Sequence, residues 1–323
     1  MRIVVLGAAG MLGSMVVEWL HRDQSLSILG IVRSAAVAQQ FAKLYPDIEW
    51  QTLDVENCLL KNVVDTTQQA EWVINCIGVI KPHIHEDNSA EIERAIHVNA
   101  LFPHVLARAA GKQGFQVLQI ATDCVYAGTK GKYLEQDGHD ALDVYGKTKS
   151  LGEVRLSNVH HLRVSIIGPE PRKHVSLLDW FLNHPPGSSV KGFKNHDWNG
   201  ITTLHFARLC HGLIHQQCTL NHMQHVLPDD VLSKADLLQC CAEAFDREDI
   251  QIVPIEAQTT VDRTLATTDP VTNCKLWEAA GYSQPPSIRQ MIAELSQFDY
   301  EFGNKRTSAP VATFGYKLIT RER

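Results

Sequence analysis

The chain of 323 residues lacks several features that mark specialised classes of protein. Its eight cysteines include no Cys-x-x-Cys pair and are too sparse for a disulfide scaffold, which favours a reducing, cytoplasmic setting. It has no run of 18 uncharged apolar residues, so we expect no membrane-spanning segment. Thirty lysines and arginines against 36 aspartates and glutamates give a formal charge of -6, which argues against a nucleic-acid partner.

What the chain does have is an alternation of short β-branched runs with segments of helical periodicity. A strand is predicted over 3–6, followed by a glycine turn and a helix over 11–21. The pattern continues with strands over 27–32, 48–53, 71–77 and 116–121, and helices over 35–44 and 88–113. This alternation predicts an α/β fold in which helices cover both faces of a doubly wound, Rossmann-type parallel sheet.

The pattern changes near residue 170, where prolines interrupt regular structure. We therefore predict a dinucleotide-binding domain over 1–170, a smaller C-terminal substrate-binding region over 171–303, and a loosely held basic tail over 304–323. A helix over 204–215, an apolar run over 224–227, and a helix over 234–245 capped by Ser233 suggest that the second region is partly interleaved with the first sheet.

The turn after the first strand places glycines at 7, 10 and 13. Gly7 permits a tight turn, Gly10 lets a pyrophosphate approach the backbone, and Gly13 lets the helix pack close to the sheet. The helix that begins at Met11 and Leu12 then directs its N-terminus at the phosphates. A tight turn without a ligand is the alternative, but the flanking strand and helix favour a dinucleotide site.

The second strand ends at Arg33, where dinucleotide folds usually carry an acidic residue that holds the ribose hydroxyls. Arginine followed by Ser34 can pair with a 2′-phosphate, so we expect NADP(H) rather than NAD(H). A solvated arginine at a strand end is the alternative interpretation. Asp54 and Val55, after the third strand, are expected near the adenine, although an ordinary turn carboxylate fits nearly as well.

Tyr145 and Lys149 lie one helical turn apart, downstream of Thr122 at the end of the fifth strand. On one helix face, the ammonium can stabilise a phenolate, so we expect the pKa of Tyr145 to fall below its usual value of about 10. Such spacing often marks only an exposed helix face. Its position downstream of a nucleotide-binding unit favours a catalytic pair over an exposed helix face.

Several separate stretches together resemble the extended short-chain dehydrogenase/reductase family and, within it, the dTDP-4-dehydrorhamnose reductase branch. Besides the glycine turn, they are Ile74-Asn75-Cys76-Ile77-Gly78, His97-Val98-Asn99, Ala121-Thr122-Asp123-Cys124-Val125-Tyr126, and Tyr145-Gly146-Lys147-Thr148-Lys149. The resemblance covers roughly residues 1–170 well and the remainder more loosely.

The resemblance implies catalytic roles for three residues. Tyr145 would protonate a carbonyl oxygen as hydride arrives, Lys149 would hold the nicotinamide ribose and tune Tyr145, and Thr122 would hydrogen-bond the same oxygen. Asn99 would support the active-site helix or a proton-relay water. The predicted cofactor contacts are Gly7, Gly10, Met11, Leu12, Gly13, Arg33, Ser34, Asp54, Val55, Cys76, Ile77, Gly78, Asn99, Tyr145 and Lys149.

The predicted sugar contacts are Val79, Asp123, Trp198 and Thr202. For Trp198 and Thr202, the alternative is a loop packed by one tryptophan. His83 and His85 have no third ligand in register, so we expect no metal.

The expected function is NADPH-dependent reduction of the 4-keto group of a nucleotide-activated deoxysugar, and a homodimer is left open. Related 4,6-dehydratases carry Asp-Glu after the threonine, whereas this chain has Asp123-Cys124, so dehydration is disfavoured. An NAD-dependent sugar-nucleotide epimerase is one alternative. The other is a non-catalytic, NADP-binding regulatory subunit, because a regulatory subunit of methionine adenosyltransferase also resembles this branch.

Overall fold

The computed structural model describes residues 1–172, 174–216 and 220–302, and a seven-stranded sheet forms the centre of this part of the chain. The strand order is β11-β6-β5-β4-β1-β2-β3, and every neighbouring pair is parallel. The strands are β1 (Arg2–Leu6), β2 (Ser27–Val32), β3 (Glu49–Thr52), β4 (Trp72–Asn75), β5 (Gln116–Thr122), β6 (Val159–Val164) and β11 (Met223–His225). The order reverses between β1 and β4, the point at which such sheets bind ligands. The predicted doubly wound fold is confirmed.

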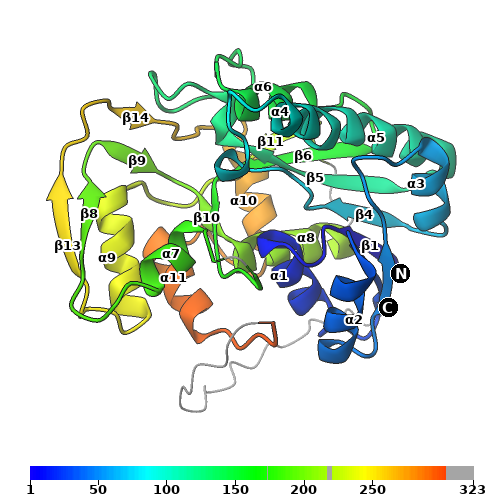
Figure 1. Cartoon of the computed structure of the whole chain (residues 1–323), viewed down its shortest axis with the longest axis horizontal. Helices are drawn as coiled ribbons and strands as arrows, with labels where there is room; N and C mark the ends of the chain where they lie inside the picture. The colour runs from blue at the N-terminus through cyan, green and yellow to red at the C-terminus, as the bar shows by residue number, and fades with distance from the viewer. Residues whose placement is uncertain (173, 217–219, 303–323) are drawn as a thin grey trace.

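Helices cover both faces of this sheet (Figure 1). One face carries α1 (Met11–Leu20), α2 (Ala35–Leu44) and α8 (Thr203–Gln216). The other carries α3 (Leu60–Thr66), α4 (Ser89–Ala95), α5 (Phe102–Gln113) and α6 (Val144–Leu151). In β1, Ile3 and Val5 pack into the first layer, while Val4 and Leu6 pack into the second. Because both faces of β1 are buried, its sequence is a continuous apolar run rather than an alternating one.

The long helix predicted over 88–113 contains an internal change of geometry. Between α4 and α5, the six residues of η2 (Ile96–Leu101) form a π-helix, a feature that often marks functional sites. This segment lies tightly against the end of α6, because a Cβ at Gly152 would stand 2.0 Å from the carbonyl oxygen of Asn99. The π-helix therefore fixes Asn99 beside the helix that carries Tyr145 and Lys149.

The C-terminal region forms small sheets at one end of the molecule (Figure 1). The paired strands are β7 (Ile166–Ile167) with β10 (Ile201–Thr202), β8 (Ser189–Phe193) with β13 (Gln251–Ile255), and β9 (His196–Trp198) with both β12 (Leu232–Ser233) and β14 (Val261–Asp262). The remaining helices are α7 (Leu177–Leu182), α9 (Lys234–Ala244), α10 (Pro270–Ala279) and α11 (Ile288–Gln297), with 3₁₀ turns η1 (Lys81–His83) and η3 (Asp123–Val125). Two elements of this part of the chain return to the main sheet and its helices: α8 packs on α1, and β11 extends the sheet beside β6.

Boundaries follow the sequence most closely where periodicity is strong. The strand predicted over 27–32 and the helix over 35–44 coincide with β2 and α2, and the helices over 204–215 and 234–245 are α8 and α9. The hydroxyl of Ser233 caps α9 by accepting a hydrogen bond from the Asp236 N–H at 3.1 Å. The short α3 and the strand β6 were not predicted. The predicted tail over 304–323 lies outside the described residues.

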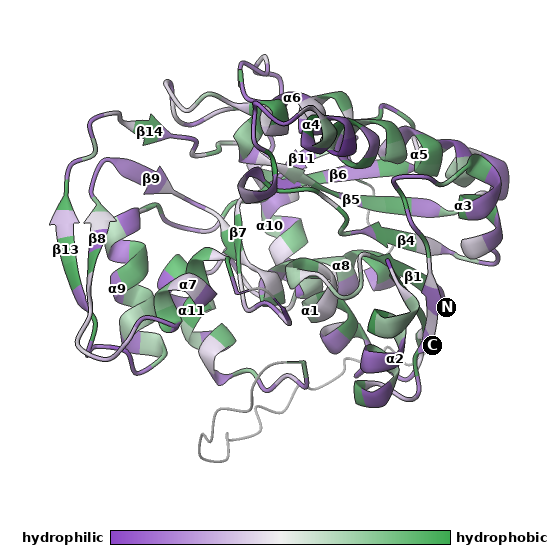
Figure 2. Cartoon of the chain, viewed as in Figure 1, coloured by the Kyte–Doolittle hydropathy of each residue, from purple (hydrophilic) through white to green (hydrophobic). Residues whose placement is uncertain are grey.

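Hydrophobic residues gather in the central strands β1 and β4 and on the helix faces turned towards them (Figure 2). None of the described helices combines the length and the apolar character needed to cross a bilayer.

Candidate active site

The glycine turn has the geometry that its spacing predicts. Gly7 adopts a φ of +75°, in the left-handed region that favours glycine. A Cβ on Gly13 would stand 2.2 Å from the Gly7 carbonyl oxygen, so only glycine lets α1 begin this close to the turn. Gly10 is the N-cap of α1 and supplies no side-chain cap. The first N–H groups of the helix can therefore bind an anion.

A cavity of about 240 Å³, the glycine cavity, opens at this turn and is lined by many of the predicted cofactor residues. Its lining includes Gly7, Gly10, Arg33, Asp54, Val55, Cys76, Ile77 and Gly78, together with the predicted sugar contact Val79. Met11, Leu12, Gly13, Ser34, Asn99, Tyr145 and Lys149 do not line it. Met11, Leu12 and Gly13 start α1, Ser34 begins the turn into α2, Asn99 supports the cavity wall, and Tyr145 and Lys149 lie on α6.

At one end of this cavity, Arg33 forms ion pairs with Glu56 at 3.2 Å and with Asp54 at 3.9 Å. The arginine side chain is 66% exposed, so both pairs are accessible to an incoming anion. Ser34 is the N-cap of α2, but its hydroxyl makes no capping hydrogen bond, which leaves that helix start open too. The site thus offers a cation and an open helix N-terminus to an anion, while the carboxylates of Asp54 and Glu56 compete with that anion for Arg33.

Sequence reasoning missed Arg172, which also lines the cavity. Its Nη2 donates a hydrogen bond to the Ala9 carbonyl oxygen at 3.2 Å, which brings the guanidinium to the glycine turn. No local pattern marks it, because its partner lies 163 residues away in the chain.

Thr122, at the end of β5, holds the turn η3 that follows it. Its Oγ1 accepts a hydrogen bond from the Cys124 N–H at 3.1 Å and donates to Asp123 Oδ1 at 3.2 Å. The Thr122 side chain also acts on the Tyr145 phenol and lowers its pKa, against the effect of burial. The structure therefore brings together Thr122 and Tyr145, which are 23 residues apart in the sequence.

The helix α6 is held firmly against this turn. Asp143 caps α6 by accepting a hydrogen bond from the Gly146 N–H at 2.8 Å. A Cβ on Gly146 would stand 2.5 Å from the Cys124 carbonyl oxygen, so glycine is required between Tyr145 and Lys147 for this close contact. These contacts fix the backbone of α6 on both sides of Tyr145.

The expected lowering of the Tyr145 pKa is wrong. Burial raises the pKa of Tyr145, and the neighbouring Cys124 and Asp123 act in the same direction against the Thr122 hydrogen bond. Lys149 directs its Nζ to the Ile120 carbonyl oxygen at 3.0 Å. Burial lowers the pKa of Lys149 itself to about 8. Tyr145 and Lys149 share the helix α6, but their spacing carries no information about desolvation.

Asn99 joins the two halves of the candidate site. Its Nδ2 donates to the Val79 carbonyl oxygen at 2.9 Å, and its Oδ1 accepts from the Val79 N–H at 2.8 Å. The same Nδ2 lies 3.3 Å from Thr148 Oγ1 on α6. Asn99 therefore couples the cavity wall after β4 to the helix of Tyr145.

Two predicted sugar contacts are buried packing residues, and the expectation of direct contact is wrong for both. Thr202 is 1% exposed and pairs its hydroxyl with His205 Nδ1 at 2.7 Å. Trp198 is 4% exposed and donates from Nε1 to Ser165 Oγ at 2.8 Å. These contacts leave little of either side chain for a ligand, which favours the alternative of a loop packed by one tryptophan.

Asp123 remains at the site, next to a thiol that stays neutral. Burial raises the pKa of Asp123, against the opposing charges of Arg263 and Lys234. Burial also raises the pKa of Cys124 to about 12. A neutral thiol cannot take the part of the second carboxylate of a dehydratase, in agreement with the sequence-based argument. No local sequence pattern marks Lys234 or Arg263, which come from the C-terminal region.

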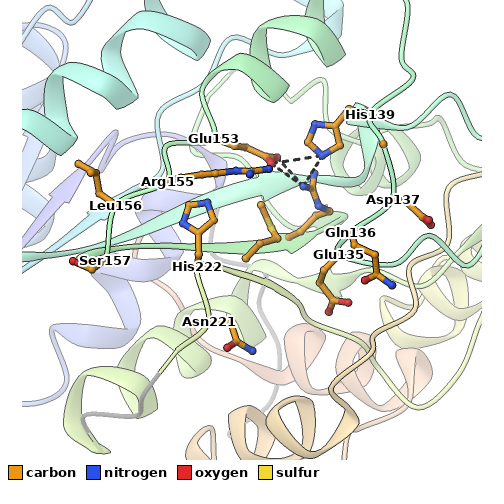
Figure 3. A pocket seen from close by; sticks show the side chains of 13 residues that line it. Glu135, Gln136, Asp137, His139, Glu153, Arg155, Leu156, Ser157, Asn221 and His222 are labelled. Atoms are coloured by element: carbon orange, nitrogen blue, oxygen red, sulfur yellow. Dashed lines mark hydrogen bonds and ion pairs between the residues drawn. The ribbon is translucent and has the colours of Figure 1, made fainter.

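Another cavity, of about 750 Å³, is lined by none of the predicted site residues. Figure 3 shows it, with Glu153 and His139 close to each other on one wall. Arg163, which also lines this cavity, bonds both of them through Nη2. Arg163 also donates from Nη1 to the Thr122 carbonyl oxygen at 2.8 Å. This cavity therefore borders Arg163, which supports the end of β5, and not the candidate site itself.

One group of described residues has the composition of a metal site. The Nε2 atoms of His211 and His215 lie 2.9 and 2.7 Å from Asp23 Oδ2. However, Trp19 Nε1 donates to His211 Nδ1 at 3.2 Å, which places the proton of neutral His211 on Nε2. A metal-bound histidine instead donates its other ring N–H to an acceptor. The arrangement is that of a hydrogen-bonded triad between α8 and the segment that follows α1.

The sheet order, the glycine cavity and the group formed by Thr122, Tyr145 and Lys149 place the protein among the extended short-chain dehydrogenase/reductases. The model of one family, described as the RmlD substrate binding domain, matches residues 1–172. The chain belongs to that family.

Among similar proteins is methionine adenosyltransferase 2 subunit beta of Xenopus tropicalis, 23% identical over 91% of this chain and 86% of that protein. The match to the Bos taurus subunit is 27% identical and covers 47% of this chain, and the chain spans only 41% of that relative's length.

Two solved structures share the fold. The dTDP-4-dehydrorhamnose reductase of Bacillus anthracis, in complex with NADP, has a TM-score of 0.68 at 17% identity and covers 91% and 98% of the two chains. The UDP-glucuronic acid 4-epimerase of Bacillus cereus, in complex with UDP-glucuronic acid and NAD, has a TM-score of 0.69 at 16% identity and covers 92% and 99%.

Proposed function

We propose that the protein is an NADPH-dependent reductase of the 4-keto group of a nucleotide-activated deoxysugar. The observation that carries the proposal is the packing of Tyr145 against Thr122 at the end of β5, with Lys149 on the same helix. Family membership supports the class of reaction. The position of these residues beyond the carboxyl ends of the strands fits the ligand site of an open α/β sheet.

The residues of the glycine cavity fit a dinucleotide. Gly10 leaves the start of α1 uncapped for the pyrophosphate, and Arg172 adds a cation at the same turn. Arg33 and Ser34 suit a 2′-phosphate, which favours NADP(H) over NAD(H). When bound, the reduced dinucleotide supplies the hydride.

The chain's own residues supply the proton. Because burial raises the pKa of Tyr145, the phenol keeps its proton at neutral pH and can donate it to the carbonyl oxygen. Thr122 offers a second hydroxyl to the same oxygen, which stabilises the negative charge that develops there. With a pKa of about 8, Lys149 is still mostly charged at pH 7 and adds to this stabilisation.

We place this activity in a reducing compartment such as the cytoplasm. The support is the cysteine chemistry: every cysteine in the described part of the chain is a free thiol.

A panel of nucleotide-linked 4-keto sugars, assayed for loss of NADPH absorbance, tests the proposal. We expect stoichiometric oxidation of NADPH with at least one member of the panel, and slower turnover with NADH. An epimerase would instead retain tightly bound NAD through purification and consume no reductant. Either of those two results would contradict the proposed reaction.

A second candidate function is that of a non-catalytic, NADP-binding regulatory subunit. The similarity to methionine adenosyltransferase 2 subunit beta over 91% of this chain favours it. Recovery of a stoichiometric partner enzyme on affinity purification, with no reductase activity on any keto sugar, would support this candidate. The presence of Thr122, Tyr145 and Lys149 together favours the reductase.

A further inference from the structure

The short strand β11 returns the chain to the edge of the main sheet and brings His225 beside Arg163. The two residues are register partners on β11 and β6, so their side chains lie on the same face of the sheet. Both residues are fully buried, and Arg163 Nε donates a hydrogen bond to His225 Nε2 at 3.1 Å. His225 therefore contacts the same guanidinium that bonds the Thr122 carbonyl oxygen at 2.8 Å.

The hydrogen bonds of His225 fix its tautomer and its charge. Nδ1 lies 2.7 Å from the Ala266 carbonyl oxygen, which can only accept, so the ring proton is on Nδ1. Nε2 then carries a lone pair and accepts from Arg163. Burial lowers the pKa of His225, and the charge of Arg163 acts in the same direction. The ring is thus a neutral acceptor held between the guanidinium and the main chain at Ala266.

The Arg163 guanidinium bonds a different set of partners through each of its three nitrogens. Nη1 donates to the Thr122 carbonyl oxygen, and Nη2 donates to Glu153 and His139. Nε donates to His225. Because a guanidinium is planar and rigid, the contact at Nε also sets the direction in which Nη1 meets the end of β5.

We propose that His225 is a positioning residue of the candidate site, which acts through Arg163 on Thr122. The inference rests on the proposed function, since it assumes that the Thr122 hydroxyl bonds the carbonyl oxygen of a bound substrate. His225 Nε2 orients the guanidinium, and the guanidinium holds the end of β5, which carries that hydroxyl. Stabilisation of the sheet edge alone is the competing role, and it predicts no specific loss of turnover.

Two amide substitutions separate the two hydrogen bonds of the ring. The side-chain oxygen of glutamine reaches the position of Nε2, so His225→Gln keeps an acceptor for Arg163. The side-chain nitrogen of asparagine reaches the position of Nδ1, so His225→Asn keeps the donor to Ala266 and removes the acceptor for Arg163. His205→Asn is the matched control, since His205 is equally buried but bonds Thr202 on another element.

The test measures kcat and KM of the full chain with NADPH and dTDP-4-dehydrorhamnose, together with hydrogen–deuterium exchange along β5. We expect His225→Asn to lower kcat by about 10- to 100-fold, because a small displacement at the reacting atoms has a large effect on rate. KM for NADPH should stay near the wild-type value, and exchange at the end of β5 should increase even without ligands. His225→Gln should keep kcat within a few-fold of wild type.

Melting temperature separates this effect from a loss of stability. His205→Asn should melt at a lower temperature than wild type and keep its kcat. If His225→Asn does not fold, His225→Met takes its place, because methionine has nearly the length of glutamine but only a weak acceptor.

Two kinds of result would overturn the inference, and they are distinguishable. If wild type reduces the keto sugar but the asparagine and glutamine variants have equal kcat, or exchange at the end of β5 is unchanged, the positioning role fails and the proposed function stands. If wild type reduces neither dTDP-4-dehydrorhamnose nor any other nucleotide-linked 4-keto sugar, the proposed function fails and takes the inference with it.

Discussion

The Nη1 of Arg163 donates a hydrogen bond of 2.8 Å to the main-chain carbonyl oxygen of Thr122. Arg163 is fully buried and also bonds Glu153 at 2.9 Å, His225 at 3.1 Å and His139 at 3.1 Å. A buried guanidinium with this many partners fixes the end of β5, and with it the hydroxyl that faces Tyr145. Arg163 is a positioning residue of the candidate site.

Replacing Arg163 should therefore destabilise the protein strongly. Arg163→Gln leaves the Glu153 carboxylate without its cation, and we expect the free energy of unfolding to fall by about 3–5 kcal/mol. Urea denaturation at neutral pH measures this loss. Arg155→Gln, which changes an exposed arginine of the same cavity, should stay within about 0.5 kcal/mol of wild type. Equal stability of the two variants would refute the positioning role.

Asp54 and Glu56 compete with a bound 2′-phosphate for Arg33, so removing one of these carboxylates should raise the affinity for NADPH. Glu56→Gln removes the carboxylate that lies 3.2 Å from the guanidinium, so a 2′-phosphate should bind more easily. Because exposed ion pairs contribute about 0.2–1 kcal/mol, we expect NADPH to bind about 1.5- to 5-fold more tightly, with NADH unchanged. Arg33→Asp should do the opposite and weaken NADPH far more than NADH. Fluorescence titration with both cofactors checks the pair, and parallel changes for NADPH and NADH would contradict the assignment.

The lowered pKa of Lys149 predicts an alkaline limit on activity. Lys149 loses its proton as the pH rises through about 8, instead of near its usual value of 10.5. Turnover that depends on the charged ammonium should then decline above about pH 8. Lys149→Arg, whose side chain stays charged, should shift this decline to higher pH, at reduced overall rate. A profile of kcat/KM that is flat through about pH 9 in wild type would count against a role for this charge.

Two glycines provide a matched test of the turn. Gly13→Ala would place its Cβ 2.2 Å from the Gly7 carbonyl oxygen, so we expect clear destabilisation and loss of dinucleotide binding. Gly111→Ala, within α5, meets no atom within 4 Å and should stabilise the protein by about 0.5–1 kcal/mol. Thermal unfolding and NADPH binding distinguish the two. Normal cofactor affinity in Gly13→Ala would show that the close packing at the turn is not required.

Local periodicity and glycine spacing predicted the strands β1 to β5, the helices α2 and α9, and the geometry of the glycine turn, because those features depend on neighbours in the chain. Arg172 and Lys234 could not be found in this way, since their surroundings are built from residues far away in the sequence. The same limit explains the error on the Tyr145 pKa: a spacing of four residues places two side chains on one face but does not measure their burial. Thr202 was misassigned for a related reason, because nothing local reveals that its hydroxyl is paired with His205.

The central claim is that the Tyr145 phenol donates the proton when a dinucleotide bound in the glycine cavity supplies the hydride. The most direct measurement compares wild type and Tyr145→Phe for NADPH affinity and for turnover of the keto sugar that wild type reduces. We expect the variant to bind NADPH within a few-fold of wild type while kcat falls by about 100- to 10,000-fold, because only the proton donor is removed. Turnover that remains within about tenfold of wild type, with the fold intact, would contradict the assignment of Tyr145 as the general acid.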